Sequence, residues 1–194
     1  TVCAADRDEA VAGLRALAAG DIAAPGSPAA GVVGPHQGTC GPGTVFVYSG
    51  QGSQWTGMGR QLLADEPAFA EAVEALEPDF VAEVGFSLYD VLAAGEELTG
   101  IERIQPVLVG IQLALTALWR SYRVEPDAVI GHSMGEITAA VVAGALTPAE
   151  GLRVIAKRSQ LMSRRADTGA IALLELDAPA TEALIADFPG VTVA

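Results

Sequence analysis

The sequence has 194 residues, which is long enough for one domain with its own hydrophobic core or for part of a larger domain. Hydrophobic residues make up 51% of it and charged residues 18%, and this composition excludes an intrinsically disordered chain. The formal net charge of −13 at pH 7 argues against nucleic acid and anionic membranes as partners, because both bind clustered Lys and Arg side chains.

The chain begins with a predicted helix and a predicted linker. Apolar residues at helical spacing indicate a helix over residues 6–19, with Asp6 as its N-cap. Residues 20–43 are rich in glycine and proline, which excludes a helix or a central strand. The N-terminus lacks the pattern of a signal peptide, and Cys3 and Cys40 form no metal-ligand or disulfide pattern. We therefore expect a cytoplasmic protein without a metal site.

From residue 44 onward, predicted strands alternate with predicted helices. Short apolar runs indicate strands at Val45–Tyr48 and at residues 128–130. Apolar residues at helical spacing predict five helices, at residues 60–64, 67–76, 106–122, 136–145 and 149–164. We place Pro67 and Pro106 at the starts of two of these helices. This order of elements favours an α/β fold in which helices cover a short parallel sheet.

The most apolar stretch of the sequence is residues 107–119. Its apolar residues fall on all faces of a helix, which predicts a helix buried nearly all round. It is too short to cross a bilayer, so we expect no membrane contact. The chain ends with a predicted strand at residues 170–176, a helix at 179–187 and a strand at 191–193.

The chemistry is predicted at Gly131-His132-Ser133-Met134-Gly135. The pattern G-x-S-x-G is weak by itself, but here it lies where an apolar strand meets an apolar helix. A nucleophile elbow needs that setting, because the tight turn lifts the serine to the sheet edge and glycines on both sides avoid clashes. The backbone N–H groups of the following helix would stabilise an oxyanion. The alternative is a serine in an ordinary tight turn.

The sequence offers Ser133 no clear general base. His36 lies in the predicted linker, and His132 is the immediate neighbour of the serine. Consecutive side chains at a strand end point to opposite sides, which places His132 poorly for taking the serine proton. We expect His132 to shape the turn, to bind substrate or to be purely structural.

Three motifs in order resemble the malonyl-type acyltransferases. Residues 48–55 (YSGQGSQW) and 57–59 (GMG) resemble the signature after their first strand, and residues 131–136 (GHSMGE) resemble their nucleophile motif. Residues 158–162 (RSQLM) resemble their substrate-arginine helix, 25 positions after the serine. This resemblance covers residue 44 to the end. Residues 6–11 and the Gly/Pro-rich stretch after them resemble the linker between ketosynthase and acyltransferase in modular polyketide synthases, so the chain resembles an acyltransferase domain of a modular type I polyketide synthase.

The resemblance implies a role for each matching residue. Ser133 would carry the acyl group as an ester, and the backbone N–H groups of Gln51 and Met134 would form the oxyanion hole. Arg158 would bind the free carboxylate of a malonyl-type group through its guanidinium fork. Gln105 would lie near the acyl pocket, where His132 could also bind substrate. The alternatives are a solvated helix face for Arg158 and a helix-entry residue for Gln105.

The resemblance also implies a domain organisation. Residues 1–43 would be a remnant of the linker between ketosynthase and acyltransferase. Residues 44–168 would form the N-terminal part of an α/β-hydrolase-like large subdomain, and residues 169–194 would begin a small ferredoxin-like subdomain. The catalytic histidine of the family would then lie beyond Ala194, so that the chain stops before it and is expected to be inactive alone.

The implied reaction uses a coenzyme A thioester as substrate and no tightly bound cofactor. The partners would be the phosphopantetheine arm of an acyl carrier protein and the ketosynthase domain of the same synthase. Residues 100–106 and 118–122 resemble methylmalonyl-type domains more than malonyl-type domains, so methylmalonyl is the favoured extender unit. Two other functions remain open: a serine esterase or thioesterase, and a non-catalytic scaffold fragment.

Overall fold

A computed structural model of the chain describes residues 7–8, 11–13, 15, 43–165, 169–170, 172 and 174–193. The chain divides into two units, Thr1–Gly43 and Thr44–Ala194. The helix predicted over residues 6–19 and the linker predicted over residues 20–43 lie for the most part outside the described residues. The second unit contains both strands and the helices α2 to α8.

A two-stranded parallel sheet joins two distant parts of the sequence. Strand β1 (Val45–Tyr48) pairs with strand β2 (Ala128–Gly131), and the register places Tyr48 opposite Gly131. The backbone N–H of His132 donates to the carbonyl of Tyr48 at 2.9 Å, which extends the pairing beyond the strands. Both predicted strands are confirmed, and helices α2 to α5 form the crossover that a parallel pair requires.

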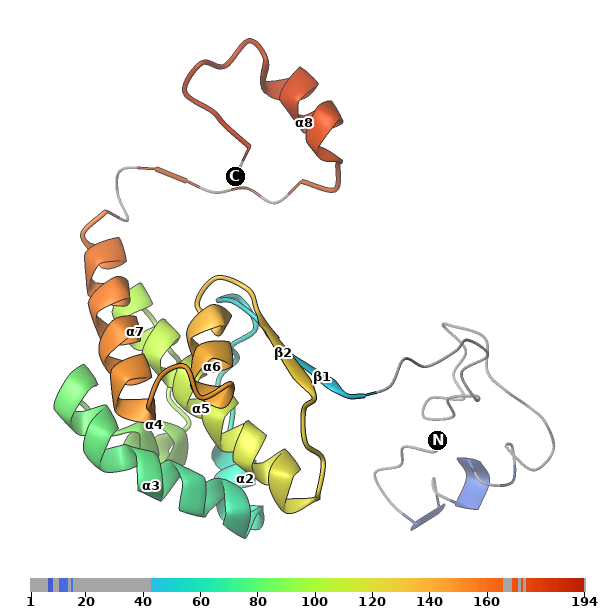
Figure 1. The fold of residues 1–194 in the computed structure, drawn as a ribbon, viewed down its shortest axis with the longest axis vertical. Helices are drawn as coiled ribbons and strands as arrows, with labels where there is room; N and C mark the ends of the chain where they lie inside the picture. The colour runs from blue at the N-terminus through green and yellow to red at the C-terminus, as the bar shows by residue number, and fades with distance from the viewer. Residues whose placement is uncertain are drawn as a thin grey trace. The chain divides into compact units, whose positions relative to one another are not determined.

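Three long helices form the hydrophobic core: α3 (Pro67–Val84), α5 (Ile101–Ser121) and α7 (Pro148–Ser163). Each of them packs against the other two, and Figure 1 shows them together. Their apolar side chains that are 0% exposed are Phe69, Val73, Phe80, Val107, Val109, Ala114, Leu152 and Ile155. The structure is therefore the α/β fold that the sequence predicts, with most of its buried apolar surface in the helices.

Helix α5 begins earlier than predicted. It starts at Ile101 after Gly100, whose φ is 81°, and Pro106 lies inside the helix and not at its start. A proline within a helix forfeits one hydrogen bond, and here the burial of the surrounding apolar residues offsets that loss. The helix is long and apolar enough to cross a membrane by composition, but 61% of its most apolar window is buried inside the protein, as in a core helix.

The shorter helices complete the body of the protein. Helix α2 (Arg60–Asp65) confirms its prediction, and α6 (Gly135–Val142) packs on both strands. Helix α4 (Leu88–Ala94) was not predicted, although its start and stop signals are present in the sequence. The hydroxyl of Ser87 caps it by accepting from the N–H of Asp90.

Other helix ends also differ from the sequence prediction. Helix α6 ends at Val142 and not at residue 145, since Gly144, with a φ of 76°, ends the helical backbone. Helix α3 continues through Pro78 to Val84, because Phe80 beyond the proline is fully buried in the core. Helix α7 begins at Pro148 behind a capping box in which Thr147 and Glu150 exchange hydrogen bonds.

The last described element is α8 (Ala178–Ile185), which corresponds to the helix predicted at residues 179–187. Neither flanking strand is observed. Residues 191–193 are not in a strand, and neither are the described residues between 170 and 176. A strand needs a neighbouring strand to pair its backbone N–H and C=O groups, and the described residues supply no such strand for these two segments. The ferredoxin-like subdomain therefore stays a prediction.

Candidate active site

The turn after β2 holds Ser133 in a strained conformation. Its φ is 55°, in the left-handed region that side chains other than glycine rarely adopt. A Cβ atom at Gly131 would overlap the backbone of Glu136, and one at Gly135 would overlap the carbonyl of Tyr48. Glycine is therefore required on both sides of the serine, and the strained turn predicted from the sequence is confirmed. Ser133 is exposed to solvent.

The register of the sheet places the two predicted oxyanion donors at equivalent positions. Gln51 follows Tyr48 by three residues, Met134 follows Gly131 by three residues, and these strand ends are paired side by side. Within the described residues, neither backbone N–H donates to another protein atom. The side chain of Met134 is fully buried in the core and fixes the start of α6. Both N–H groups are thus available to a ligand at the edge of the sheet.

A chain of hydrogen bonds joins four of the predicted site residues. Arg158 of α7 donates through Nη2 to Oγ of Ser133 at 3.0 Å and through Nη1 to Oε1 of Gln105 at 2.7 Å. Gln105 of α5 then donates through Nε2 to Oε1 of Gln51 at 3.1 Å. The structure thereby brings together residues from four separate segments of the sequence.

Arg158 is half-buried, and none of the carboxylates in the described residues forms an ion pair with it. Its neighbour on the same helix, Arg153, forms an ion pair with Glu83 at 2.8 Å. The partners of Arg158 are neutral, and a carboxylate is the ligand that a guanidinium binds best. The arrangement therefore suits a small anion next to Ser133.

Gln105 is a buried residue whose position is fixed by its surroundings in the core. It is 2% exposed, and both ends of its amide are used, since Oε1 accepts from Arg158 and Nε2 donates to Gln51. The helix-entry interpretation is therefore wrong, because Gln105 lies within α5 and not at its start.

His132 takes no part in the hydrogen-bond network around Arg158. Its ring packs against Gly50, where an added Cβ would come within 3.0 Å of Nδ1. Within the part of the chain that the structure describes, its side chain has no hydrogen-bond partner and does not contact Ser133 through a hydrogen bond. His132 thus has the position of a residue that shapes the turn.

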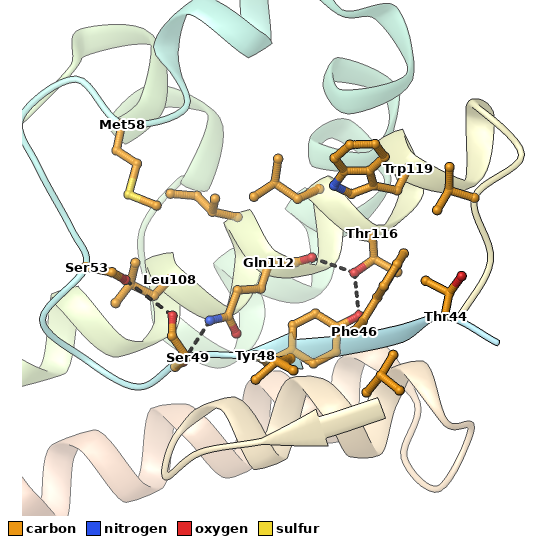
Figure 2. Close-up of a pocket in the computed structure, with 15 residues that line it drawn as sticks. Thr44, Phe46, Tyr48, Ser49, Ser53, Met58, Leu108, Gln112, Thr116 and Trp119 are labelled. Carbon is orange, nitrogen blue, oxygen red and sulfur yellow. Dashed lines mark hydrogen bonds between the residues drawn. The ribbon is translucent and has the colours of Figure 1, made fainter. Parts of the chain in front are cut away.

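The described residues contain no cluster of three His, Cys, Asp or Glu side chains that could hold a metal ion. A cavity of about 600 Å³ lies between β1 and α5, and its lining is mainly apolar. Figure 2 shows that Ser49 and Gln112 line it, whereas Ser133 and Arg158 do not. The cavity is therefore separate from the cluster around the nucleophile.

Sequence reasoning missed a polar group next to this cavity. The hydroxyl of Tyr48 lies 2.8 Å from Oγ1 of Thr116, and burial raises the pKa of Tyr48. The amide of Gln112 joins Ser49 and Thr138, which belong to two different segments. The available signal was the presence of Gln112 and Thr116 in an otherwise apolar helix, which predicts buried hydrogen bonds but not their partners.

Comparison with known proteins gives consistent results. Residues 45–194 match the family model described as acyl transferase domain. The chain is 70% identical over 193 residues to one subunit of the phenolphthiocerol/phthiocerol polyketide synthase of Mycobacterium bovis, and this match covers all of the chain and 10% of that protein.

Two solved structures are similar as well. The acyltransferase domain of the polyketide synthase PpsC of Mycobacterium tuberculosis is 68% identical with a TM-score of 0.75, over 94% of this chain and 52% of that one. The acyl transferase domain of SpnD, solved as a complex with 2-(pent-4-yn-1-yl)malonyl, is 31% identical with a TM-score of 0.60, over 69% of this chain and 32% of that one.

The chain thus spans about half of the PpsC domain and a tenth of the synthase subunit. The family match covers both strands, the serine turn and the helix of Arg158. This chain belongs to the acyl transferase domain family, in the branch found in polyketide synthases.

Proposed function

We propose that the acyltransferase containing this chain takes a malonyl-type extender unit from coenzyme A, holds it on Ser133 and passes it to the phosphopantetheine arm of an acyl carrier protein. The observation that carries the proposal is the 3.0 Å contact between Nη2 of Arg158 and Oγ of Ser133. It puts a cation that pairs with none of the described carboxylates beside the hydroxyl that would accept the acyl group.

The proposed reaction has two steps, acylation of Ser133 and transfer of the acyl group to the carrier protein. In the first, Oγ of Ser133 attacks the thioester carbonyl, its proton passes to a base, and the C–S bond breaks to release coenzyme A as a thiol. In the second, the pantetheine thiol attacks the Ser133 ester and the serine recovers its proton. In both steps the N–H groups of Gln51 and Met134 stabilise the oxyanion. We propose that the base is a histidine from a part of the domain that this chain does not span.

Arg158 selects for acyl groups that carry a free carboxylate in addition to the thioester. A malonyl or methylmalonyl group offers that carboxylate to the guanidinium, while an acetyl group would leave the cation unpaired. Gln105 supports this role, because its bond to Nη1 fixes the orientation of the guanidinium. The malonyl-type ligand with which the SpnD domain was solved supports a substrate of the same class here.

Hydrolysis by an esterase or thioesterase is the main alternative, since it would use the same serine turn. Water would replace the carrier thiol in the second step, and Arg158 would have no function in it. A scaffold role is supported only for residues 1–43, which contain no catalytic group and are proposed to link the domain to a ketosynthase.

The test is the mass of the full-length domain after it is mixed with methylmalonyl- or malonyl-coenzyme A. We expect a persistent acyl adduct on the wild type, no adduct on Ser133→Ala, and transfer of the adduct to added acyl carrier protein. Ser121→Ala is the matched control, because Ser121 ends α5 and its hydroxyl contacts only the carbonyl of Leu118 in the described residues. Rapid release of free acid without an adduct would favour the hydrolase, and an adduct on Ser133→Ala would disprove the assignment of the nucleophile.

A further inference from the structure

Gln112 links the two segments that carry the predicted oxyanion donors. It lies in the middle of α5 and donates through Nε2 to the carbonyl of Ser49 at 2.9 Å, immediately after β1. Its Oε1 accepts from the hydroxyl of Thr138 at 2.6 Å, in the first turn of α6. Figure 2 shows the amide of Gln112 pointing toward Ser49. One side chain thus contacts both sides of the proposed oxyanion hole.

The chemistry of the partners fixes the orientation of the amide. The carbonyl oxygen of Ser49 can only accept, so the NH₂ group of Gln112 must face it. Oε1 then faces Thr138, which is 0% exposed and donates its single hydroxyl proton. A flipped amide would instead place two acceptors, Oε1 of Gln112 and the carbonyl oxygen of Ser49, against each other. The link therefore has one geometry, and the positions of Ser49 and Thr138 are coupled through it.

The backbone of α5 at this point is held independently. The hydroxyl of Thr116 donates to the carbonyl of Gln112 at 2.8 Å, and the hydroxyl of Tyr48 is then left to donate to Oγ1 of Thr116 at 2.8 Å. A tyrosine phenol is protonated at neutral pH in any case, and burial raises the pKa of Tyr48 further. The hydrogen bonds of Thr116 thus involve the backbone of Gln112 and are separate from the link that its side-chain amide makes.

The residues that Gln112 links lie close in sequence to the two proposed oxyanion donors. Gln51 lies two residues after Ser49, and Met134 lies one helical turn before Thr138. In the described residues no other single side chain hydrogen-bonds to both α6 and the loop after β1. An oxyanion hole needs its donors about 2.7–3.1 Å from the oxyanion, and a displacement of about 1 Å can cost on the order of 100-fold in rate.

We propose that Gln112 is a positioning residue that sets the spacing between the N–H groups of Gln51 and Met134. It touches neither substrate nor nucleophile and acts through Ser49 and Thr138. The inference rests on the proposed function, because it concerns the oxyanion hole of that reaction. It predicts that losing the link lowers the rate of acyl transfer to Ser133 more than it weakens binding of the thioester.

The experiment measures single-turnover acylation of the full-length domain by methylmalonyl-coenzyme A, quenched and followed by intact mass. Gln112→Met keeps the length of the side chain and removes both hydrogen bonds, and Thr138→Val removes the hydroxyl at nearly constant volume. We expect each variant to lower the maximal acylation rate about 10-fold with little change in the half-saturating substrate concentration. The double variant should lose no more than either single variant, because both break one link.

Thr116→Val is the matched control. It lies one turn along α5 and loses the bonds to Tyr48 and to the carbonyl of Gln112, but it leaves the amide link intact. We expect it to lower the melting temperature and to keep the wild-type acylation rate. Equal rate losses in Thr116→Val and Gln112→Met, or wild-type rates in Gln112→Met and Thr138→Val, would overturn the inference. A wild-type domain that forms no acyl adduct would instead overturn the proposed function.

Discussion

The candidate site has two sides. The sheet side is the turn with Ser133 after β2, the helix side is Gln105 of α5 with Arg158 of α7, and their residues are held in place in different ways. On the sheet side, the position of Ser133 depends on its own left-handed φ and on two glycines that admit no Cβ. On the helix side, Gln105 and Arg158 are held by side-chain hydrogen bonds from two long helices packed in the core. The position of the proposed nucleophile is therefore set by backbone geometry, whereas the positions of the proposed substrate contacts are set by side chains.

The two sides also differ in burial. Apolar side chains of the sheet are largely exposed in this chain, with Val47 at 68% and Ile130 at 56%. Helices α3, α5 and α7 contain many fully buried apolar residues. The free energy of folding of this chain must therefore come mainly from its helices, although Ser133, the proposed nucleophile, follows a strand of the sheet.

The largest effect is expected on the helix side, from Arg158→Ala. Truncating one partner of a buried charge pair costs about 2–5 kcal/mol, which corresponds to a roughly 30- to 5,000-fold loss. We expect a loss of this size in acylation by malonyl-type thioesters. Acetyl-coenzyme A has no free carboxylate, so its slow reaction should change little. The measurement is acylation of the full-length domain by each ester in parallel.

The control for that experiment is Lys157→Ala, because Lys157 precedes Arg158 on α7 and is exposed to solvent. It should leave both esters unaffected. Equal losses for malonyl and acetyl esters in Arg158→Ala would show that the arginine supports the turn through Ser133 and does not bind the substrate carboxylate.

The second-largest effect is expected on the sheet side, where the turn that holds Ser133 depends on glycines. Gly135→Ala forces a Cβ atom into the carbonyl of Tyr48, so we expect a loss of stability at the upper end of the about 1–3 kcal/mol typical of overpacking, with loss of acylation. Gly144→Ala, just beyond the other end of α6, has open space around its Cβ and only an unfavourable φ of 76°. It should cost about 1 kcal/mol and leave the acylation rate unchanged. Wild-type acylation in Gly135→Ala would refute the tight approach of α6 to β1.

A matched pair of valines tests the difference in burial. In the 194-residue chain, Val73→Ala removes two buried methyl groups from α3 and should cost about 2 kcal/mol. Val47→Ala removes the same groups from an exposed position of β1 and should stay within about 0.5 kcal/mol. Urea unfolding measures both. A larger loss at Val47 would mean that a partner, such as a second copy of the chain, covers the sheet.

The sequence allowed much of this fold to be predicted because its main signals are local. The apolar runs of β1 and β2 and the apolar spacing of α5 and α7 each identify an element without knowledge of its neighbours. The errors fall where tertiary contacts decide. Helix α3 passes through Pro78 because Phe80 is buried beyond it, and α5 begins before Pro106 because Ile104 and Gln105 ahead of the proline are buried.

The candidate site shows the same division. Ser133 was predictable from a turn pattern, and Arg158 from its spacing to that turn together with a family resemblance. The link from Gln112 to Thr138 joins residues 26 positions apart on different helices, and no periodicity in the sequence pairs them. Such contacts depend on how α5 and α6 pack, which only the structure reveals.

The smallest effect is expected in the choice of extender unit, for which we predict a preference for methylmalonyl over malonyl. One of the two segments that suggest it, residues 100–106, covers the N-cap and first turns of α5 and includes Gln105 next to Arg158, so it lies close to where the acyl group would bind. The other, residues 118–122, lies at the opposite end of the same helix. One methyl group in an apolar pocket is worth about 1–3 kcal/mol, and we expect the lower end, about 10-fold, because a pocket that admits the methyl group also admits hydrogen. Competing equal concentrations of both coenzyme A esters for the full-length domain and weighing the acyl-enzyme measures the ratio directly. A dominant malonyl adduct would reverse the preference, and since both esters carry the carboxylate that Arg158 would bind, it would leave the helix-side assignment intact.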